Sequence, residues 1–427
     1  MTVLAIAALA AVMLALGFEM LLVLGVPALI AKLAFFPTIP DLVTVQKLVG
    51  GVNHATLLAI PFFIFAAEIM ARGSIARNLT ALVRAMIGHR AGGIGHTTVA
   101  ACMAFGSISG SAPATVAALG RIMHPELQRA GYRERFSLGL IVASAETALL
   151  IPPSITLIIY GWLTGTSIGA LFAGGLAVGI VLGLAFMAYV QWESWRAGIA
   201  RQPRPGWAER RAAFAAAGWA LGLPVIILGG IYGGVFTPTE AAAVSVLYAL
   251  AVEFGVYREM GWRDLCAVAE ESAITNAVIF ILLAVGSLLS YLITLAQVPN
   301  EVLALIQELQ LGPIGFLLIV NAIFFVAGMF VDPNSALLVL VPTLAPVAAA
   351  LGIDPVHFGL IVCLNICIGM ITPPFGLDIF VAASTLGKPV MAIVAGVWPF
   401  VAVNLAVLMV VSYVPAVSLA LPRLVFG

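Results

Sequence analysis

The scarcity of charge is the feature that most constrains what this chain can fold into. Only 9% of the 427 residues are charged and 63% are hydrophobic, whereas soluble globular domains carry about 25% charged residues. A soluble cytosolic or secreted fold is excluded, because so few polar side chains cannot cover its surface. The formal net charge of zero leaves no basic surface for nucleic acid. We therefore expect an all-α polytopic membrane protein.

Apolar stretches that can cross a bilayer recur along the whole sequence, since a spanning helix needs about 20 mostly apolar residues. They lie near 1–16, 18–36, 52–71, 93–120, 136–165, 168–192, 213–233, 239–257, 273–296, 314–348, 357–383 and 390–421. The first stretch has no basic segment before it, because Lys32 is the first basic residue. We interpret it as a retained helix rather than a signal peptide.

The arginines indicate how the spans are oriented. They gather in four connections, at 72–90, 121–135, 196–211 and 258–263. Short basic loops stay on the cytoplasmic side of a membrane, so these connections are predicted to face inward. The connections near 297–313 and 350–356 contain acidic residues but no lysine or arginine. We expect those two connections to face outward.

An internal repeat relates the two halves of the sequence. The tetrapeptide Gly-Leu-Ile-Val that begins at Gly139 recurs at Gly359, and Pro152-Pro153 recurs as Pro373-Pro374. Glu19 matches Glu240 at the same offset as the proline pairs. The charge pattern places the two copies in opposite orientations. Inverted repeats with interrupted helices are typical of secondary transporters, whose sites lie near the middle of the membrane.

Two segments contain small polar residues between apolar helical stretches. The segment 106–115 reads GSISGSAPAT and has arginines on both flanks, and 328–335, which reads GMFVDPNS, occupies the matching place in the second half. A segment that enters and leaves on the same side of the membrane is a re-entrant hairpin, and glycine, serine and proline at its tip suit a chain reversal. Such open backbone must line a cavity or be buried in protein.

Two further breaks are marked by proline pairs, in the segments 146–154 and 365–376. Proline removes an amide donor and frees carbonyl groups from the helix, and free carbonyl oxygens suit a small cation. The N-terminus of a half-helix suits an anion. A single proline pair is also typical of a structural kink, and a glycine-serine turn of close helix packing. Four breaks in a two-fold arrangement favour a transport site, with two cation sites beside one anion site.

Ionisable residues inside membrane spans are functional candidates by default. Glu146, Asp332 and Asp378 lie beside the breaks, whereas we interpret Glu68 and Glu240 as helix caps or partners of arginines. No HExxH and no GxxxxGK[ST] motif occurs, so neither a metalloprotease nor an ATPase is indicated. Ser109 as the nucleophile of a membrane-embedded hydrolase lacks a histidine at matching depth. We therefore expect a protein that is not an enzyme.

Four motifs carry a resemblance to a known family. They are GSISGSAPATVAALG at 106–120, ETALLIPPS at 146–154, GGVFTPTEAAAV at 233–244 and the run 330–376. The chain resembles the large membrane subunit of the tripartite ATP-independent periplasmic (TRAP) transporters, elevator-type carriers of the ion transporter superfamily. The resemblance extends over essentially the whole length.

The resemblance implies an inverted repeat with two re-entrant helical hairpins and two broken helices. The hairpins and broken helices, at 93–165 and 297–385, would form a mobile transport domain. Residues 1–92 and 166–296 would be scaffold, followed by a C-terminal helix at 386–427. It further implies sodium-coupled uptake of an organic acid across the bacterial inner membrane, with a periplasmic substrate-binding protein. A small four-helix membrane subunit is expected as a separate polypeptide, with membrane lipid around both.

The resemblance also assigns site residues. One sodium site would be framed by Ser107, Ser109, Gly110, Glu146 and Thr147. A second sodium site would be framed by Gly328, Asp332, Gly369 and Thr372. Ser109, Ser111, Thr115, Pro153, Asn334 and Ser335 would lie near the substrate. Sialic acid, C4-dicarboxylates, keto acids and sugar acids all suit an anion site of this kind. A standalone organic-anion carrier coupled to sodium or protons is the alternative, and an ion channel a further one.

Overall fold

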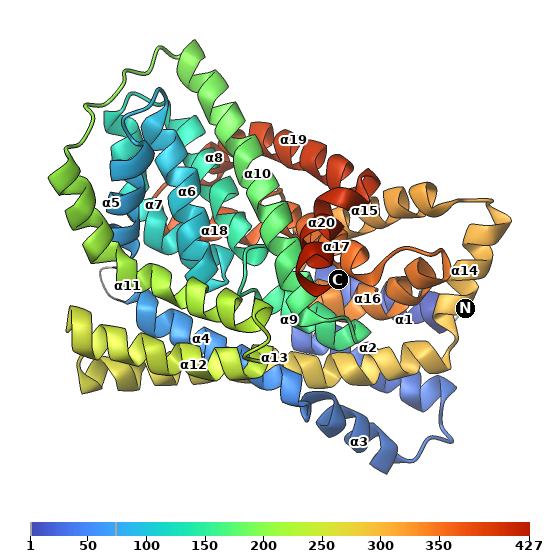
Figure 1. Ribbon diagram of the computed structural model, residues 1–427. Helices are drawn as coiled ribbons and strands as arrows, with labels where there is room; N and C mark the ends of the chain where they lie inside the picture. Colours follow the sequence, from blue (N-terminus) through green and yellow to red (C-terminus); the bar gives the residue numbers. More distant parts are fainter. Residues whose placement is uncertain (1, 73–74) are drawn as a thin grey trace.

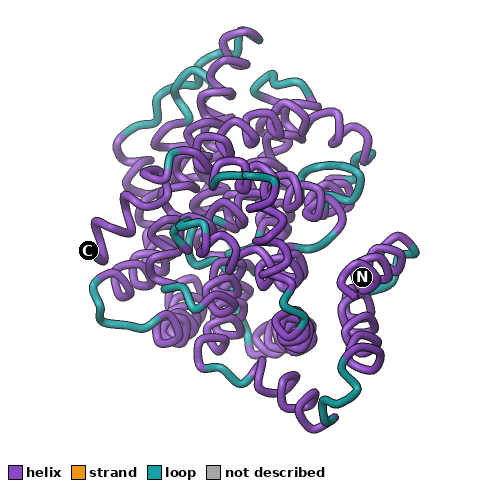
Figure 2. The backbone as a smooth tube through the Cα atoms, turned by 90° about the vertical axis from the view of Figure 1, so that its right-hand side faces the viewer, coloured by secondary structure: helices purple, strands orange, loops and turns teal. Residues whose placement is uncertain are grey.

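The computed structural model describes residues 2–72 and 75–427, and every regular element among them is helical (Figure 2). Among the described residues, seven helices are long and apolar enough to cross a membrane. They are α10 (Ile168–Arg196), α11 (Trp207–Tyr232), α12 (Pro238–Leu250) with its π-helical extension η3 (Ala251–Tyr257), α13 (Trp262–Leu295), α15 (Pro313–Phe330), α16 (Pro333–Ala350) and α19 (Val390–Tyr413). Helices α3 (Asp41–Val52) and α4 (Ala59–Ala71) meet at a bend of 49° and form an eighth span if counted together. The chain is therefore a multi-pass membrane protein, as predicted.

Shorter helices complete the two halves. The first half contains α1 (Thr2–Ala15), α2 (Met20–Phe35), η1 (Ala55–Leu58), α5 (Ile75–Ile87), α6 (Gly93–Ser109), α7 (Ala112–Arg129), α8 (Glu134–Ala145), η2 (Glu146–Leu149) and α9 (Ile155–Thr164). The second half contains α14 (Val298–Glu308), α17 (Pro355–Met370), α18 (Leu377–Leu386) and α20 (Pro415–Phe426).

The four predicted breaks are confirmed as interruptions of helix. Gly110 and Ser111 separate α6 from α7, and Val331 and Asp332 separate α15 from α16. The second pair of breaks lies at 150–154, between η2 and α9, and at 371–376, between α17 and α18. Each contains its proline pair, and both Pro-Pro peptide bonds are cis. The hairpin arms α6, α7, α15 and α16 are each just long enough to cross a bilayer, so the re-entrant course of the two hairpins stays a prediction.

The packing of the hairpins follows the same rule in both halves. The first arm packs on the broken helix of its own half, α6 on α8 and α15 on α17. The second arm packs on the broken helices of both halves, α7 on α8 and α18 and α16 on α17 and α9. Likewise α8 packs on α19, and α17 packs on α10. These equivalent contacts in the two halves fit a two-fold repeat, and the contacts between halves bring both diproline breaks to the centre of the molecule.

The broken helices form the core. Every residue from 136 to 154 and from 357 to 372 is buried. A helix that is apolar on all sides suits the interior of a protein as well as lipid, so the sequence of these segments is compatible with their central place. Beside them, α4 packs on α12 and α13, and α11 packs on α12 along one side of the molecule (Figure 1). Helix α4 also contacts α6 and α9, which sets one face of α4 against the breaks.

Candidate functional site

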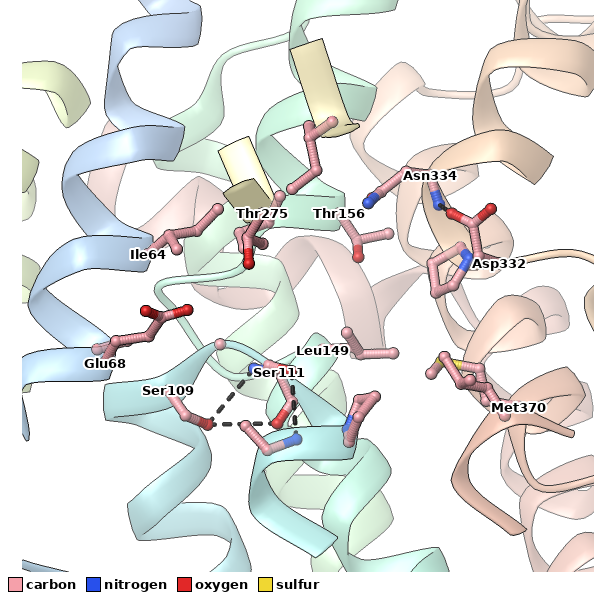
Figure 3. A pocket seen from close by; sticks show the side chains of 18 of the residues that line it. Ile64, Glu68, Ser109, Ser111, Leu149, Thr156, Thr275, Asp332, Asn334 and Met370 are labelled. Carbon is pink, nitrogen blue, oxygen red and sulfur yellow. Dashed lines mark hydrogen bonds between the residues drawn. The ribbon is translucent and has the colours of Figure 1, made fainter. Parts of the chain in front are cut away.

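A cavity of about 260 Å³ lies where all four breaks meet (Figure 3). The hairpin tips and the broken helices supply Ser109, Gly110, Ser111, Pro113, Ala114, Leu149, Ile155, Thr156, Asp332, Pro333, Asn334, Met370 and Leu377. The remaining lining residues come from α4 and α13, which we call the α4–α13 wall: Ile64, Ala67, Glu68, Ala71, Thr275 and Ile279. Ligand pockets commonly measure about 300–1,000 Å³, so this one suits a small solute.

The tip of the first hairpin is held against the first diproline break. Gly110 has a φ of 58°, a left-handed conformation that glycine adopts without steric cost. Its N–H donates to the Gly106 carbonyl at 2.8 Å and ends α6. A Cβ atom on Gly110 would lie 2.6 Å from the Pro153 carbonyl oxygen. Both the backbone conformation and the space therefore require glycine here.

Hydroxyl groups organise the same tip. Ser109 Oγ lies 3.1 Å from Thr115 Oγ1, and Thr115 Oγ1 donates to the Ser111 carbonyl at 2.8 Å. Ser111 in turn caps α7 by accepting from the Ala114 N–H at 3.4 Å. Ser109 and Ser111 line the cavity, whereas Thr115 is fully buried behind the tip.

The tip of the second hairpin is built around a carboxylate. Asp332 Oδ2 accepts from the Asn334 N–H at 3.1 Å and from the Ser335 N–H at 3.2 Å, which caps α16. Asp332 and Asn334 face the cavity from the side opposite Glu68 (Figure 3). Ser335 lies elsewhere: it lines a second, apolar cavity of about 460 Å³ between α2, α13 and α16.

Behind the cavity, each first arm touches its broken helix through small residues. A Cβ atom on Gly106 would lie 2.7 Å from Ala148 Cα, and one on Gly369 would lie 2.4 Å from the Gly328 backbone. The two contacts occupy equivalent positions in the two halves. The backbones of two helix ends therefore come close together twice, and the last carbonyl groups of a helix have no partner within it. Hard oxygen donors of this kind suit a small cation.

Side chains near these two contacts are consistent with oxygen donation to a cation. Ser107 Oγ donates to the Ala104 carbonyl at 2.7 Å, Thr147 Oγ1 to Ser144 at 2.7 Å and Thr372 Oγ1 to Ile368 at 2.6 Å. Each hydroxyl hydrogen is used within its own helix, so the oxygen keeps its lone pairs.

Two buried carboxylates lie on the broken helices. Glu146 Oε1 accepts from Asn404 Nδ2 at 2.5 Å, while Glu146 Oε2 has no hydrogen-bond partner among the described residues. Neither oxygen of the fully buried Asp378 has a partner in the same part of the chain. Buried charge without partners is costly, so the free Glu146 oxygen beside the first contact fits a cation.

The electrostatics of the cavity come from helix ends rather than basic side chains. The first turns of α7, α9, α16 and α18 line it, and the N-terminal end of a helix carries partial positive charge. Its described lining residues include two carboxylates, Glu68 and Asp332, and no lysine, arginine or histidine.

The sequence favours a helix cap or an arginine partner for Glu68, but the structure places this residue at the cavity. It lies on the α4–α13 wall and points into the cavity (Figure 3), and Glu68 Oε2 accepts from Ser272 Oγ at 2.6 Å. Arg72, one turn further along α4, pairs with Glu271 instead. The signal available was an acidic residue inside an apolar stretch, which is a functional candidate by default. The interpretation of Glu240 as a cap is confirmed, because it forms a capping box with Thr237.

The residues assigned from the resemblance thus fall into two groups. Ser109, Gly110, Ser111, Asp332 and Asn334 line the cavity. The others lie off its lining: Ser107, Thr115, Glu146, Thr147, Pro153, Gly328, Ser335, Gly369 and Thr372.

Comparison with known proteins places this geometry in context. The sequence profile described as "Tripartite ATP-independent periplasmic transporter, DctM component" matches residues 7–417. The chain is 44% identical over 417 residues to the ectoine/5-hydroxyectoine TRAP transporter large permease protein of Ruegeria pomeroyi, and the match covers 97% of each chain. It is 41% identical to the C4-dicarboxylate TRAP transporter large permease protein of Pseudomonas aeruginosa over 88% of each chain.

A solved structure shares the fold. The YdaH transporter of Alcanivorax borkumensis aligns with a TM-score of 0.58 and covers 86% of both chains. The sequences are 13% identical, so the likeness concerns the arrangement of helices.

Proposed function

Since the chain belongs to the family of DctM components, the large permeases of tripartite ATP-independent periplasmic transporters, we propose that it imports a small carboxylate-bearing solute by sodium symport. The observation that carries the proposal is the cavity at which both hairpin tips and both diproline breaks meet. Four helix N-terminal turns line it. Their partial positive charge suits a carboxylate group although no basic side chain is among the described lining residues. The site is proposed to lie in the bacterial inner membrane.

Sodium is proposed to bind twice, once in each half. Ser107, Ser109, Gly110, Glu146 and Thr147 would frame one site, and Gly328, Asp332, Gly369 and Thr372 the other. The equivalent close contacts of Gly106 with Ala148 and of Gly328 with Gly369 support this pairing, because both bring the backbones of helix ends together, where the last carbonyl groups have no partner within the helix. The partnerless oxygen of Glu146 supports the first site. Bound cations would offset the carboxylates of Glu146 and Asp332 and so favour entry of a carboxylate.

The movement is proposed to be of the elevator type. The hairpins and broken helices would travel together, because each second arm packs on the broken helix of the other half. The α4–α13 wall would stay with the scaffold. The cavity lies between these two groups of helices, which is where a moving site would change its accessibility. A small four-helix membrane subunit is proposed to complete the scaffold, and a periplasmic binding protein to deliver the solute.

Uptake into proteoliposomes tests the proposal. The permease, its small subunit and its binding protein are reconstituted together, and entry of labelled solute is followed with an inward sodium gradient or with potassium in its place. We expect accumulation only with the sodium gradient. Accumulation that is equal in potassium contradicts sodium coupling, and equal uptake without the two partners would identify a standalone carrier.

A further inference from the structure

The α4–α13 wall of the cavity carries a carboxylate that the recognition of an organic anion does not need. Glu68 points from α4 toward the hairpin tips (Figure 3). One of its oxygens, Oε2, accepts from Ser272 Oγ at 2.6 Å. The other, Oε1, has no hydrogen-bond partner within the described ranges 2–72 and 75–427, and Glu68 forms no ion pair there. One oxygen therefore remains free on the cavity side of the wall.

The charged neighbours of Glu68 do not neutralise it. Arg72 and Glu271 pair with each other one turn away on α4 and α13. On the opposite side of the cavity, Asp332 adds a second carboxylate. A solute with two carboxylates would therefore place one of them near the helix N-termini and the other near like charge, which is unfavourable.

The two sides of the cavity differ in what offsets their carboxylates: Asp332 accepts from two backbone N–H groups at the N-terminus of α16, whereas Glu68 Oε1 has no partner among the described residues. The first turns of α7, α9, α16 and α18 present partial positive charge, and Glu68 presents negative charge across a space of only about 260 Å³. Resting on the proposed transport function, we propose that the solute is a small zwitterion, with its carboxylate at the helix N-termini and a cationic nitrogen at Glu68. Glu68 is then the residue that selects zwitterions over dicarboxylates.

A binding experiment on the full-length permease in nanodiscs with sodium chloride tests this assignment. The probes are ectoine, a cyclic amidine that bears an amidinium group and a carboxylate, and succinate, which bears two carboxylates. We expect the wild-type protein to bind ectoine at least about tenfold more tightly than succinate, since a paired charge is worth about 1.4 kcal/mol or more and 1.4 kcal/mol is tenfold.

Three variants assign the preference to the Glu68 charge. Glu68→Gln is expected to weaken ectoine binding at least about tenfold without weakening succinate binding, and Glu68→Asp to retain part of the ectoine affinity. Glu270→Gln is the matched control, because Glu270 is an exposed acidic residue of α13 outside the cavity lining. Thermal unfolding of each variant confirms that it is folded.

The outcomes separate this inference from the proposed function. Tighter binding of succinate than of ectoine, or ectoine binding by folded Glu68→Gln within about twofold of wild type, overturns the zwitterion assignment. Sodium-driven uptake of succinate without uptake of ectoine overturns it as well, while the proposed function stands. Failure of the reconstituted complex to take up either solute with a sodium gradient contradicts both.

Discussion

At the scale of single residues, Asp332 combines two roles that a substitution can separate. Its carboxylate caps α16 through two backbone N–H groups, and it faces the cavity as a proposed sodium ligand. Asparagine caps helices about as well as aspartate but carries no charge. Asp354 offers a matched control, because it caps α17 in the same manner at 2.8 and 3.2 Å and lies outside the cavity lining.

Asp332→Asn is therefore expected to leave the protein folded and to raise the sodium concentration for half-maximal uptake at least about tenfold, since a neutral oxygen binds a cation more weakly. Asp354→Asn is expected to leave that concentration unchanged. The measurement is the sodium dependence of initial uptake rates in proteoliposomes. If both substitutions raised the half-maximal sodium concentration equally, the weaker sodium dependence would result from lost helix capping. That result would contradict a cation role for Asp332.

At the scale of helices and hairpins, the four breaks are predictable from sequence because proline pairs and small polar turn residues favour an interruption of the helix. The direction of individual side chains is less predictable. Thr115 and Ser335 lie one turn or less beyond the tips, and helical rotation turns Thr115 into the hairpin and Ser335 toward another cavity. Glu68 was interpreted as a cap or an arginine partner, because only the packing of α4 on α13 and α6 determines which of its faces meets the breaks.

The close contact between Gly328 of the second hairpin and Gly369 of its broken helix leads to a prediction at this scale. A Cβ atom on Gly369 would lie 2.4 Å from the Gly328 backbone, which cannot move aside as a flexible side chain can. Gly369→Ala is expected to cost about 1–3 kcal/mol through overpacking and to reduce sodium-driven uptake. Gly218→Ala in α11 is the control, because a Cβ atom there meets nothing within 4 Å and alanine favours helix.

Both glycine variants are compared with the wild type by thermal unfolding in detergent and by their initial uptake rates. A Gly369→Ala protein that unfolds at the wild-type temperature and transports at the wild-type rate would show that the close contact is dispensable. If Gly218→Ala lowered the unfolding temperature and the uptake rate as much as Gly369→Ala, the assays would not distinguish tightly packed from open glycine positions.

At the scale of the whole molecule, the proposed movement divides the helices into a moving group and a standing group with the cavity between them. The resemblance predicts this division, but neither hydropathy nor charge pattern determines which helix faces meet across the cavity. Thr275 belongs to the α4–α13 wall and Asn334 to the tip of the second hairpin, and both line the cavity. An elevator movement must change the separation of these two residues.

Cross-linking tests the division. We expect Thr275→Cys and Asn334→Cys, combined in a protein whose four native cysteines are replaced, to lose uptake when a bifunctional thiol reagent joins them. Each single variant is expected to show the same uptake after treatment as before it. Full uptake by a quantitatively cross-linked double variant would contradict relative movement of the hairpin tip and the wall.

The central claim is that both halves contribute to one sodium-dependent solute site. Equilibrium binding of labelled solute to the purified permease, in sodium chloride against matched potassium chloride, tests it most directly. We predict binding in sodium only, with marked weakening by Gly110→Ala in the first half and by Gly369→Ala in the second, and none by Gly218→Ala. Binding of equal strength in potassium, or binding that survives substitution in either half unchanged, would contradict it.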